Sequence, residues 1–294
     1  CSSELAHDLG LPYWQLEDGF IGYIGHPARG GKAVSLIADP VGIYYDARQP
    51  SRLEELIATP CDDSMLARAE TLTAELLRLG ITKYNCYTAD SGLPDTLTAR
   101  LHSDPRPKVL LIDQVAGDLS IPGALASEED FVAMVAAARR NHPDARLLLR
   151  THPDTRLGKK SGVLARLALD DVEVVAEHCH PHALLNSVEA VYTVSSQMGF
   201  EALLLGKAVH CFGMPFYAGW GLTHDSKTCP RRQGPIALPQ LVAAALILYP
   251  RYLDPILGQR CEVEQVLDII AGQQSPAPRY RRLYMVGFSL WKRA

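Results

Sequence analysis

Short apolar runs and amphipathic stretches alternate along the middle of the chain, from Val109 to Gly213. The apolar runs are typical of strands, and the stretches between them repeat their apolar residues with a helical period. The predicted strands are VLLID, RLLLRTHP, VEVVAE, AVYTVSS and AVHCFG, and the predicted helices are SEEDFVAMVAAARRNHP, VLARLALD, HALLNSV and QMGFEALLLG. A capping box at Ser127 and Asp130 starts the first of these helices. This order predicts an α/β fold with a parallel, doubly wound sheet.

The amino-terminal part has shorter and less regular elements. SSELAHDLG predicts the end of a helix that stops at Gly10, PYWQLEDGF predicts a strand, and SLIADPVGIYYDA predicts two short strands broken by Pro40 and Gly42. SRLEELI and SMLARAETLTAELLRLG predict amphipathic helices, each beginning at a serine. Because a helix needs a sheet to cover, an α/β domain normally opens on a strand, and we expect this domain to lack its first strand.

A polar connector, SDPRPK, separates the two parts and predicts a domain boundary. We expect an amino-terminal domain over residues 1–104 and a carboxy-terminal domain over residues 105–275. Helices predicted from LPQLVAAALILYPRYL and CEVEQVLDIIAG close the second domain. The basic and aromatic residues 276–294 do not follow the alternating pattern.

Composition narrows the functional classes. The chain has 294 residues, 47% of them hydrophobic, and a net charge of −4, which gives no general affinity for nucleic acid. No apolar run reaches the roughly 18 residues of a membrane helix, and no signal peptide is recognised. The seven cysteines include no CxxC pair and indicate a reducing cytoplasm. HCHPH at 178–182 matches no zinc signature, so a polar loop or helix entry explains it better than a metal site.

Four predicted strands end in polar residues. VLLID leads into QVAGD, RLLLRT into HPDT and GKKS, AVYTV into SSQMGFE, and AVHCFG into MPFYAGW. Any one of these clusters is explained equally well by a strand end, a helix cap or a solvated loop. Because the carboxyl ends of parallel strands meet at one edge of a sheet, all four together predict a single cleft.

The residue types in this cleft suit a phosphorylated ligand. Ser195, Ser196 and Gln197 open a helix whose free N–H groups favour an anion. Lys159 and Lys160 add positive charge, and Glu201 can accept a ribose hydroxyl. The sequence has no GxGxxG, no phosphate-binding GxxxxGK[ST] and no Asp-x-Asp pair. The missing Asp-x-Asp pair argues against a pyrophosphate held by a metal, and a nucleoside monophosphate leaving group would need no such metal.

Asp118 is a carboxylate beside a glycine at the edge of the predicted cleft. Such a group can attack or stabilise an oxocarbenium-like centre. It can equally be a structural aspartate in an Asx turn. The spacing alone leaves both interpretations open.

Several motifs resemble the KpsC family of bacterial capsule-biosynthesis proteins, which are retaining β-Kdo glycosyltransferases. They are LEDGF, SLIADPVGIYYDA, DQVAGDLSI, RTHPDTRLGKKSG and VSSQMGFEALLLGKAVHCFGMPFYAGWGLTHD, the last being long and specific. The resemblance runs from about Gly10 to Leu253 and is greatest to the amino-terminal of two tandem transferase modules. The tail VGFSLWKRA resembles the start of the second module, so residues 276–294 are interpreted as a linker and the start of a following module.

This resemblance implies a GT-B-like architecture with two Rossmann-like domains and an active site between them. The amino-terminal domain would be on the acceptor side, and the carboxy-terminal domain would bind the nucleotide sugar. It implies CMP-β-Kdo as donor, no cofactor, and a double displacement with Asp118 as the carboxylate nucleophile. Glu17 and Asp18 would face the cleft as acid/base or acceptor-binding residues, with no choice between them. The residues implied in nucleotide-sugar binding are Gln114, Ser120, His152, Lys159, Lys160, Ser195, Ser196, Gln197, Glu201 and Tyr217.

The implied acceptor is a Kdo-bearing phosphatidylglycerol lipid, and the implied location is the inner face of the cytoplasmic membrane. A second transferase module and capsule-assembly proteins are expected partners, and nucleic acid is not. The tail can contact anionic lipid, although a linker explains it better. Two alternatives stay open: another GT-B nucleotide-sugar transferase or epimerase, and a non-catalytic scaffold for capsule assembly.

Overall fold

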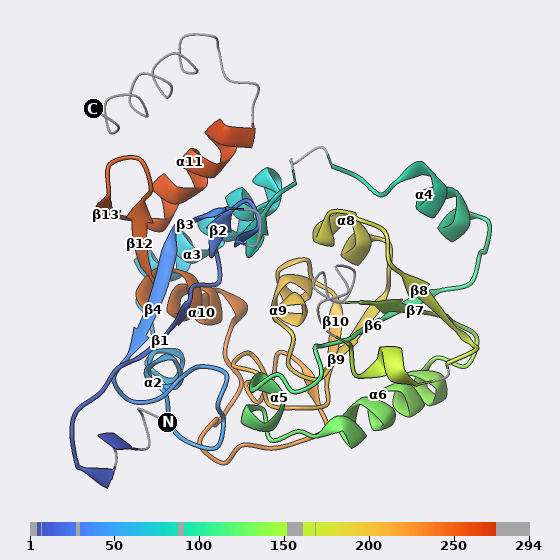
Figure 1. Cartoon of the computed structure of the whole chain (residues 1–294), viewed down its shortest axis with the longest axis horizontal. Coiled ribbons are helices and arrows are strands. Elements are labelled where there is room, and N and C mark those ends of the chain that lie inside the picture. The colour runs from blue at the N-terminus through green and yellow to red at the C-terminus, as the bar shows by residue number, and fades with distance from the viewer. Residues whose placement is uncertain are drawn as a thin grey trace.

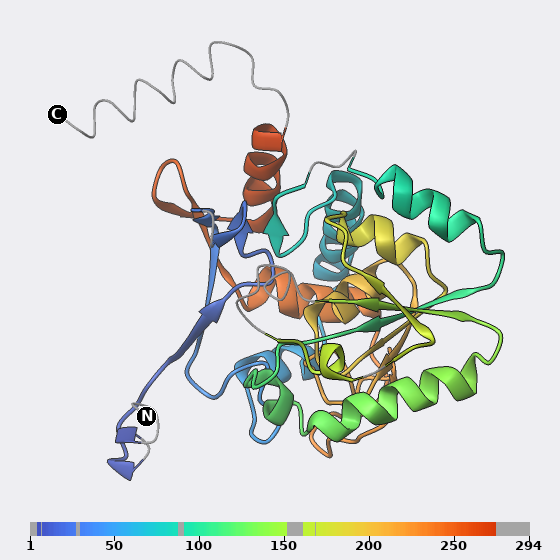
Figure 2. The same cartoon turned by 45° about the vertical axis from the view of Figure 1, so that its right-hand side comes forward.

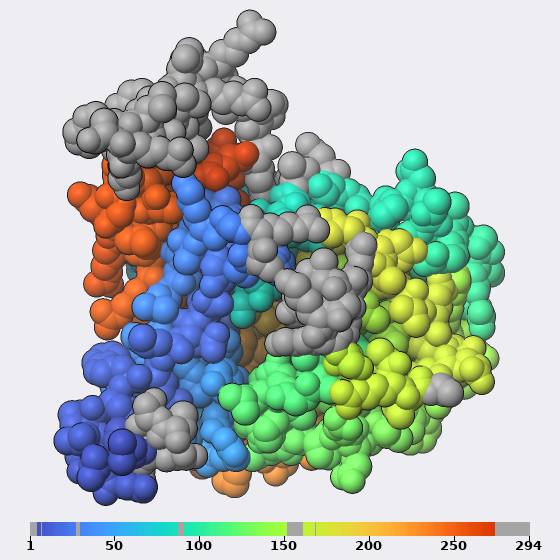
Figure 3. Space-filling model, in the orientation of Figure 1, coloured from blue at the N-terminus to red at the C-terminus, as the bar shows by residue number. Residues whose placement is uncertain are grey.

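The computed structural model describes residues 5–6, 8–27, 30–87, 91–151, 161–167 and 169–274. Two groups of elements lie side by side within these ranges (Figure 1). One is the carboxy-terminal domain, from β6 to β11, and the other combines the amino-terminal elements with the last strands and helices. A hollow opens on the molecular surface between blue amino-terminal residues and green residues of the carboxy-terminal domain (Figure 3).

The carboxy-terminal domain contains a six-stranded sheet in the order β11-β10-β9-β6-β7-β8. Every neighbouring pair in it is parallel, as predicted. The strands are β6 (Lys108–Ile112), β7 (Arg146–Arg150), β8 (Val172–Val175), β9 (Ala190–Thr193), β10 (Ala208–Cys211) and β11 (His224–Asp225). The order reverses between β6 and β9, and ligands of doubly wound sheets bind at such a switch point.

Helices cover both faces of this sheet, which explains its continuous apolar strands. Val109 and Leu111 of β6 pack toward α6, whereas Leu110 and Ile112 share a core with α8 and α9. Figure 2 shows the green helix α6 below the sheet and the yellow helix α8 above it. The covering helices are α6 (Glu128–Asn141), α8 (Pro181–Asn186) and α9 (Gln197–Leu204). A short helix, α5 (Ser120–Gly123), precedes α6. The predicted capping box of Ser127 and Asp130 is present at the start of α6.

The amino-terminal strands form two small sheets rather than one parallel sheet. One has the order β1-β4-β12-β13 and is antiparallel, and the other has the order β3-β2-β5. Their strands are β1 (Gln15–Asp18), β2 (Tyr23–Ile24), β3 (Lys32–Ala33), β4 (Ser35–Asp39), β5 (Tyr84–Asn85), β12 (Arg251–Asp254) and β13 (Gln259–Cys261). The helices of this part include α2 (Arg52–Ala58) and α3 (Asp63–Leu79). Helix α4 (Asp95–His102), which leads to β6, lies beside the carboxy-terminal domain, where its Arg100 pairs with Glu173 of β8 (Figure 1).

The prediction of a second strand between Val41 and Ala47 was wrong. Asp39, at the end of β4, is fully buried and its carboxylate accepts the N–H groups of Val41 and Gly42 at 2.8 and 3.0 Å. It also accepts the N–H of Arg52 at 2.9 Å. These bonds turn the chain immediately after β4 and direct it toward α2.

The last elements cross back to the amino-terminal sheet, although we had expected them to close the carboxy-terminal domain. They are α10 (Leu238–Val242), the π-helical turn η3 (Ala243–Leu248), β12, β13 and α11 (Val263–Gln274). The predicted helix stops near Pro250 because proline lacks a backbone donor, and β12 then pairs with β4. Tyr249 donates to the buried Asp39 at 2.7 Å. The boundary predicted at residue 104 stays a prediction.

The helix predicted from Val163 to Asp170 was also wrong. Its described residues contain only a 3-10 turn, η2 (Leu164–Arg166). The buried carboxylate of Asp113 accepts the N–H groups of Leu164 and Ala165 at 2.9 and 3.2 Å. These donors are the ones a helix start leaves free, so the segment is fixed to the end of β6.

Candidate active site

A cavity of about 1220 Å³ lies between the two groups of elements. The carboxy-terminal domain lines it with the loops after β6, β7 and β9, which meet at the switch point of the sheet. The amino-terminal part lines it with Glu17, Tyr44 and Tyr45, and with residues around β5. The predicted cleft therefore exists. Its side opposite the sheet is lined by residues of the amino-terminal part.

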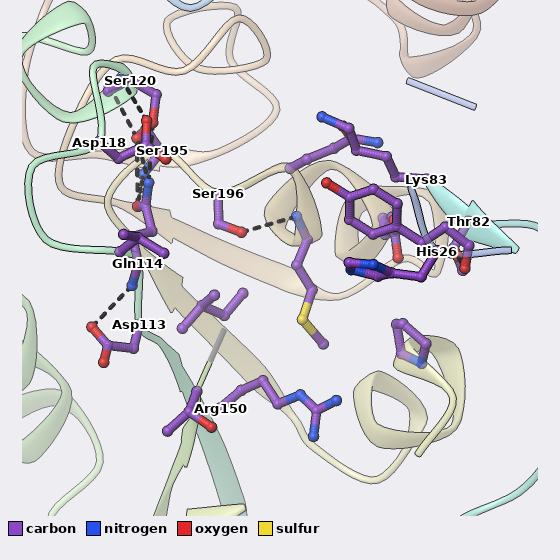
Figure 4. A pocket seen from close by; sticks show the side chains of 18 of the residues that line it. His26, Thr82, Lys83, Asp113, Gln114, Asp118, Ser120, Arg150, Ser195 and Ser196 are labelled. Carbon is purple, nitrogen blue, oxygen red and sulfur yellow. Dashed lines mark hydrogen bonds between the residues drawn. The ribbon is translucent and has the colours of Figure 1, made fainter. Parts of the chain in front are cut away.

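Gln114 joins the two strand ends that flank the switch point. Its Nε2 donates to Ser195 Oγ at 2.9 Å, and its Oε1 accepts the Ser195 N–H at 2.8 Å. Ser195 Oγ also donates to the carbonyl of Ser120 at 3.2 Å. These bonds hold the loops after β6 and β9 together at one end of the cavity (Figure 4). Gln114, Ser120 and Ser195 all line the cavity, so the hydrogen bonds among them also fix the shape of its wall.

Asp118 lies in the loop after β6 and is exposed to the cavity. Gly117 precedes it with φ of 80°, a left-handed conformation that glycine adopts without strain. The N–H of Ser120 donates to Asp118 Oδ1 at 2.8 Å, as in an Asx turn. Among the described residues no hydrogen bond to Asp118 Oδ2 is seen, so this oxygen is available to a ligand. The structural and catalytic interpretations of Asp118 are therefore compatible.

Neighbouring Glu17 and Asp18 point to different surroundings, as successive residues of a strand do. Glu17 lines the cavity. Asp18 accepts the Tyr23 hydroxyl at 2.7 Å, and this bond raises the pKa of Tyr23 to about 12. Burial raises the pKa of Tyr45, and the negative charges of Glu17, Asp46 and Asp118 raise it further. The charges of Glu17, from the amino-terminal part, and Asp118, from the carboxy-terminal domain, therefore both raise the pKa of Tyr45.

Helix α9 begins at the cavity and contacts the amino-terminal part. Its N-cap, Ser196, accepts the Met198 N–H at 3.3 Å, so the helix starts where the sequence predicted. Gln197 Nε2 donates to the carbonyl of Phe20, in the amino-terminal part, at 2.8 Å. Gln197 Oε1 and Glu201 Oε2 are buried acceptors without a hydrogen-bond partner among the described residues. Both residues line the cavity, whereas these two oxygen atoms are themselves shielded from solvent.

Glu201 is 8% exposed, and burial raises the pKa of its carboxyl group to about 7. The peptide N–H and the charge of Lys83 oppose this shift. His182 Nε2 lies 3.8 Å from Glu201 Oε2 and is also buried and unpartnered among the described residues. Burial lowers the pKa of His182 to about 4, so this ring is neutral near pH 7.

Three predicted donor-binding residues, His152, Lys159 and Lys160, lie outside the described residues. Two cations that the sequence analysis missed line the cavity instead: Arg150 and Lys83. Arg150 ends β7, is 7% exposed and donates to the carbonyl of Glu177 at 2.7 Å. The sequence did contain a signal for Arg150, because this arginine stands at the carboxyl end of the apolar strand RLLLR, where ligand-binding residues of such sheets lie. Lys83 had no such signal, because it belongs to a separate part of the chain.

Tyr217 was predicted to bind the nucleotide sugar, but it does not line the cavity in the part of the chain that the structure describes. It is fully buried under α9, and its hydroxyl donates to the Ser196 carbonyl at 2.5 Å. A side chain on Gly199 would meet this hydroxyl, since an added Cβ would lie 2.2 Å from it. Tyr217 therefore supports the start of α9 from below, and its predicted role in binding the nucleotide sugar stays a prediction.

The HCHPH segment is a helix entry, as the sequence favoured. His180 is the N-cap of α8, and its Nδ1 accepts the N–H of His182 at 3.0 Å. Its Nε2 lies 2.9 Å from the carbonyl of Gly80 and therefore carries the ring proton. Among the described residues, no group of three or more His, Cys, Asp or Glu side chains has a metal-binding arrangement. No helix of the described residues is long and apolar enough to span a membrane.

The model of a family described as "Capsule polysaccharide biosynthesis protein" matches residues 2–75 and 63–252. Capsule polysaccharide modification protein LipA of Neisseria meningitidis serogroup B is 40% identical over 294 residues, covering 97% of this chain. The lipopolysaccharide-processing protein LpsZ of Rhizobium meliloti is 35% identical over 273 residues, covering 92% of this chain and 61% of that protein. This chain spans only 41% of the length of the Neisseria protein.

Two solved structures share the fold. The Thermosulfurimonas dismutans KpsC beta Kdo 2,4 transferase is 42% identical with a TM-score of 0.84, covering 92% of this chain and 83% of that one. The beta Kdo 2,7 transferase of the same protein is 29% identical with a TM-score of 0.68, covering 93% and 89%. These matches and the six-stranded parallel sheet confirm the predicted α/β, GT-B-like fold class.

Proposed function

The chain belongs to the capsule polysaccharide biosynthesis family, and on this premise we propose that it is a retaining glycosyltransferase. The donor is CMP-β-Kdo and the acceptor is a Kdo-bearing phosphatidylglycerol lipid, so that transfer builds a short β-linked Kdo oligosaccharide. The solved relatives, named beta Kdo transferases, support this choice. One observation carries the mechanism: Asp118, Glu17 and the first turn of α9 line the same cavity.

In the first step, Asp118 Oδ2 attacks the anomeric carbon of Kdo. The bond from that carbon to the CMP phosphate breaks, and the phosphate leaves with the electron pair. The Ser120 N–H on Oδ1 at 2.8 Å supports this step because it fixes the carboxylate while the other oxygen attacks. The product is a glycosyl ester on Asp118, with inverted configuration.

In the second step, an acceptor hydroxyl attacks the same carbon from the face that CMP vacated. Glu17 takes the hydroxyl proton, and the bond to Asp118 breaks to regenerate its carboxylate. Two inversions give net retention. Glu17 suits this role better than Asp18, because Glu17 lines the cavity whereas Asp18 is bonded to the Tyr23 hydroxyl.

The donor's charges match the groups around α9. The positive end of the helix dipole of α9 favours the CMP phosphate, and Arg150 supplies a cation in the same cavity. Gln197 and Glu201 line the cavity on one face of α9, and in this proposal Glu201 accepts a ribose hydroxyl. No metal takes part in this proposal, because CMP leaves as a monophosphate.

We further propose that the reaction takes place in the cytoplasm, at the inner face of the membrane that holds the lipid acceptor. A second transferase module and capsule-assembly proteins are the partners that this role requires. The Neisseria relative, of which this chain spans 41%, is long enough to hold a second module, and this supports the proposal.

Transfer from CMP-Kdo to a synthetic Kdo-terminated acceptor tests the proposal. We expect product with the unmodified chain, loss of at least about 10³-fold in kcat with Asp118→Ala, and a Kdo adduct at position 118 by intact-protein mass spectrometry. Asp144→Ala, exposed and outside the cavity, is the matched control. Full activity of Asp118→Ala excludes it as nucleophile. Transfer from a nucleoside diphosphate sugar, or no turnover with any donor, supports the alternative transferase or the scaffold.

A further inference from the structure

The side of the cavity that belongs to the amino-terminal part carries a cation that the transfer steps above do not use. We call this side the amino-terminal wall; it includes Glu17, Tyr44, Lys83 and Tyr84. Lys83 directly precedes β5, and in Figure 4 it lies across the pocket from Asp118. Its Nζ lies 5.8 Å from the Tyr84 ring centroid, and within the described ranges it forms no ion pair with a carboxylate.

Hydrogen bonds to the backbone hold Lys83 in place. Its carbonyl accepts the N–H groups of Gly22 and Tyr23, each at 3.1 Å. The buried Asn85 side chain closes the turn around it, accepting the Thr82 N–H at 2.9 Å and donating to the Thr82 carbonyl at 2.9 Å. The same amide donates to the Tyr23 carbonyl at 2.8 Å. A backbone that is fixed before binding loses little conformational freedom when a ligand arrives.

The charge of Lys83 is only partly compensated by its surroundings. It acts on the buried Glu201, whose carboxyl group has its pKa raised to about 7 by burial. Below pH 7 this carboxyl group is mostly protonated, so it contributes less than a full negative charge. An ammonium group that lines a cavity in this state favours an anionic ligand, because a carboxylate forms charge-assisted hydrogen bonds with it.

The amino-terminal wall is continuous from the proposed base to this cation. Burial raises the pKa of Tyr44, and the negative charges of Glu17 and Tyr84 raise it further, so both groups lie near the Tyr44 hydroxyl. The cavity of about 1220 Å³ is larger than the roughly 300–1,000 Å³ of a site for one small ligand. It therefore has room for the end of an acceptor beside the donor.

We propose that Lys83 selects the acceptor by binding the carboxylate of its terminal Kdo residue. A Kdo residue carries a carboxylate that is ionised near pH 7, and Lys83 Nζ donates to its oxygens while Glu17 takes the proton of a hydroxyl group. This inference rests on the proposed function, because the Kdo-bearing acceptor defines the ligand. It adds that the acceptor is recognised by charge, so that a neutral sugar of the same shape is a poor acceptor.

Isothermal titration with a synthetic β-Kdo methyl glycoside and with its carboxamide, which has no charge, tests this proposal. The unmodified chain should bind the carboxylate form about 10-fold or more tightly than the carboxamide. Lys83→Met should weaken binding of the carboxylate form about 10-fold and change binding of the carboxamide less than about 2-fold. Lys83→Arg keeps the charge and should keep most of the preference. Lys32→Met on exposed β3, outside the cavity, is the matched control.

CMP binding should be the same in all these chains, which also shows that the variants are folded. A preference for the carboxylate that survives Lys83→Met, or equal weakening of both glycosides, overturns the proposal. Weaker CMP binding by Lys83→Met with unchanged glycoside binding assigns Lys83 to the donor and also overturns it.

Kdo transfer measured in parallel separates this inference from the proposed function. Lys83→Met should raise the acceptor KM about 10-fold and change kcat less than about 3-fold, because it removes binding rather than chemistry. Transfer by the unmodified chain with an unchanged acceptor KM in Lys83→Met refutes this inference alone. No transfer by the unmodified chain refutes the proposed function, and the titrations still decide whether Lys83 binds the carboxylate.

Discussion

Replacing Glu201 with glutamine should make the protein more stable at alkaline pH. Burial raises the pKa of Glu201 from its ordinary value of 4.5 to about 7. Between these two pH values the carboxyl group is therefore mostly protonated in the folded chain and mostly ionised in the unfolded chain. The unfolded state then binds fewer protons, and stability falls as the pH rises from 4.5 through 7. Glutamine has nearly the same shape but never ionises, so Glu201→Gln removes this loss.

The size of the effect follows from the two pKa values of Glu201, 4.5 and about 7. The ionisation of Glu201 lowers the free energy of unfolding by about 1 kcal/mol at pH 5 and by about 3 kcal/mol at pH 8. The advantage of Glu201→Gln should therefore grow by about 2–3 kcal/mol over this interval. His182, which faces Glu201, has a pKa of about 4 and stays neutral throughout, so it does not add to the change.

Urea unfolding of both proteins at pH 5 and pH 8 measures this difference. Glu70→Gln, on the exposed side of α3, is the control, and its effect should stay within about 0.5 kcal/mol. An advantage of Glu201→Gln that is the same at both pH values refutes the argument that burial keeps Glu201 protonated. CMP titration at pH 8 should show about 10-fold weaker binding to Glu201→Gln, since a neutral amide accepts hydroxyl hydrogen bonds less strongly than a carboxylate.

Two further substitutions test how the site is supported. Gly199→Ala should lower the free energy of unfolding by about 1–3 kcal/mol, because its Cβ would lie 2.2 Å from the Tyr217 hydroxyl. Urea unfolding measures this loss, and adding Tyr217→Phe to the Gly199→Ala chain should recover part of it. Glu54→Gln should lower the free energy of unfolding by about 3 kcal/mol, because the buried Glu54 carboxylate pairs with Arg231 at 2.9 Å and Arg232 at 2.8 Å; a loss below about 1 kcal/mol by thermal or urea unfolding contradicts this.

Local patterns predicted the part of the site that depends on parallel strands. Asp118 and Ser195 follow two apolar strands, and a parallel doubly wound sheet places the ends of its strands at one edge. The start of α9 followed from the polar residues before its apolar face. These features were readable because each depends on residues within one strand or one helix and on a rule that holds for all such sheets.

Contacts between distant segments were not readable in the same way. Nothing in LEDGF separates Glu17 from Asp18 until the Tyr23 hydroxyl bonds to Asp18. Asp113 follows an apolar strand, a position typical of catalytic residues in such sheets. Its carboxylate instead accepts hydrogen bonds from the backbone N–H groups of residues 164 and 165. Tyr217 follows a strand end as expected but lies beneath α9. In each case a partner side chain or peptide decides what the residue does.

The sequence alone determined the α/β class, the parallel sheet from β6 to β10 and the polar strand ends that meet at one cavity, because hydrophobic periodicity and helix capping act over neighbouring residues. Only the tertiary structure decided that Glu17 faces the cavity, that Lys83 and Arg150 are its described cations, and that the last strands return to β4. Gln197 meets Phe20 across 177 positions, and Gln114 meets Ser195 across 81. Such pairs form only when the whole core is packed, so no local pattern specifies them.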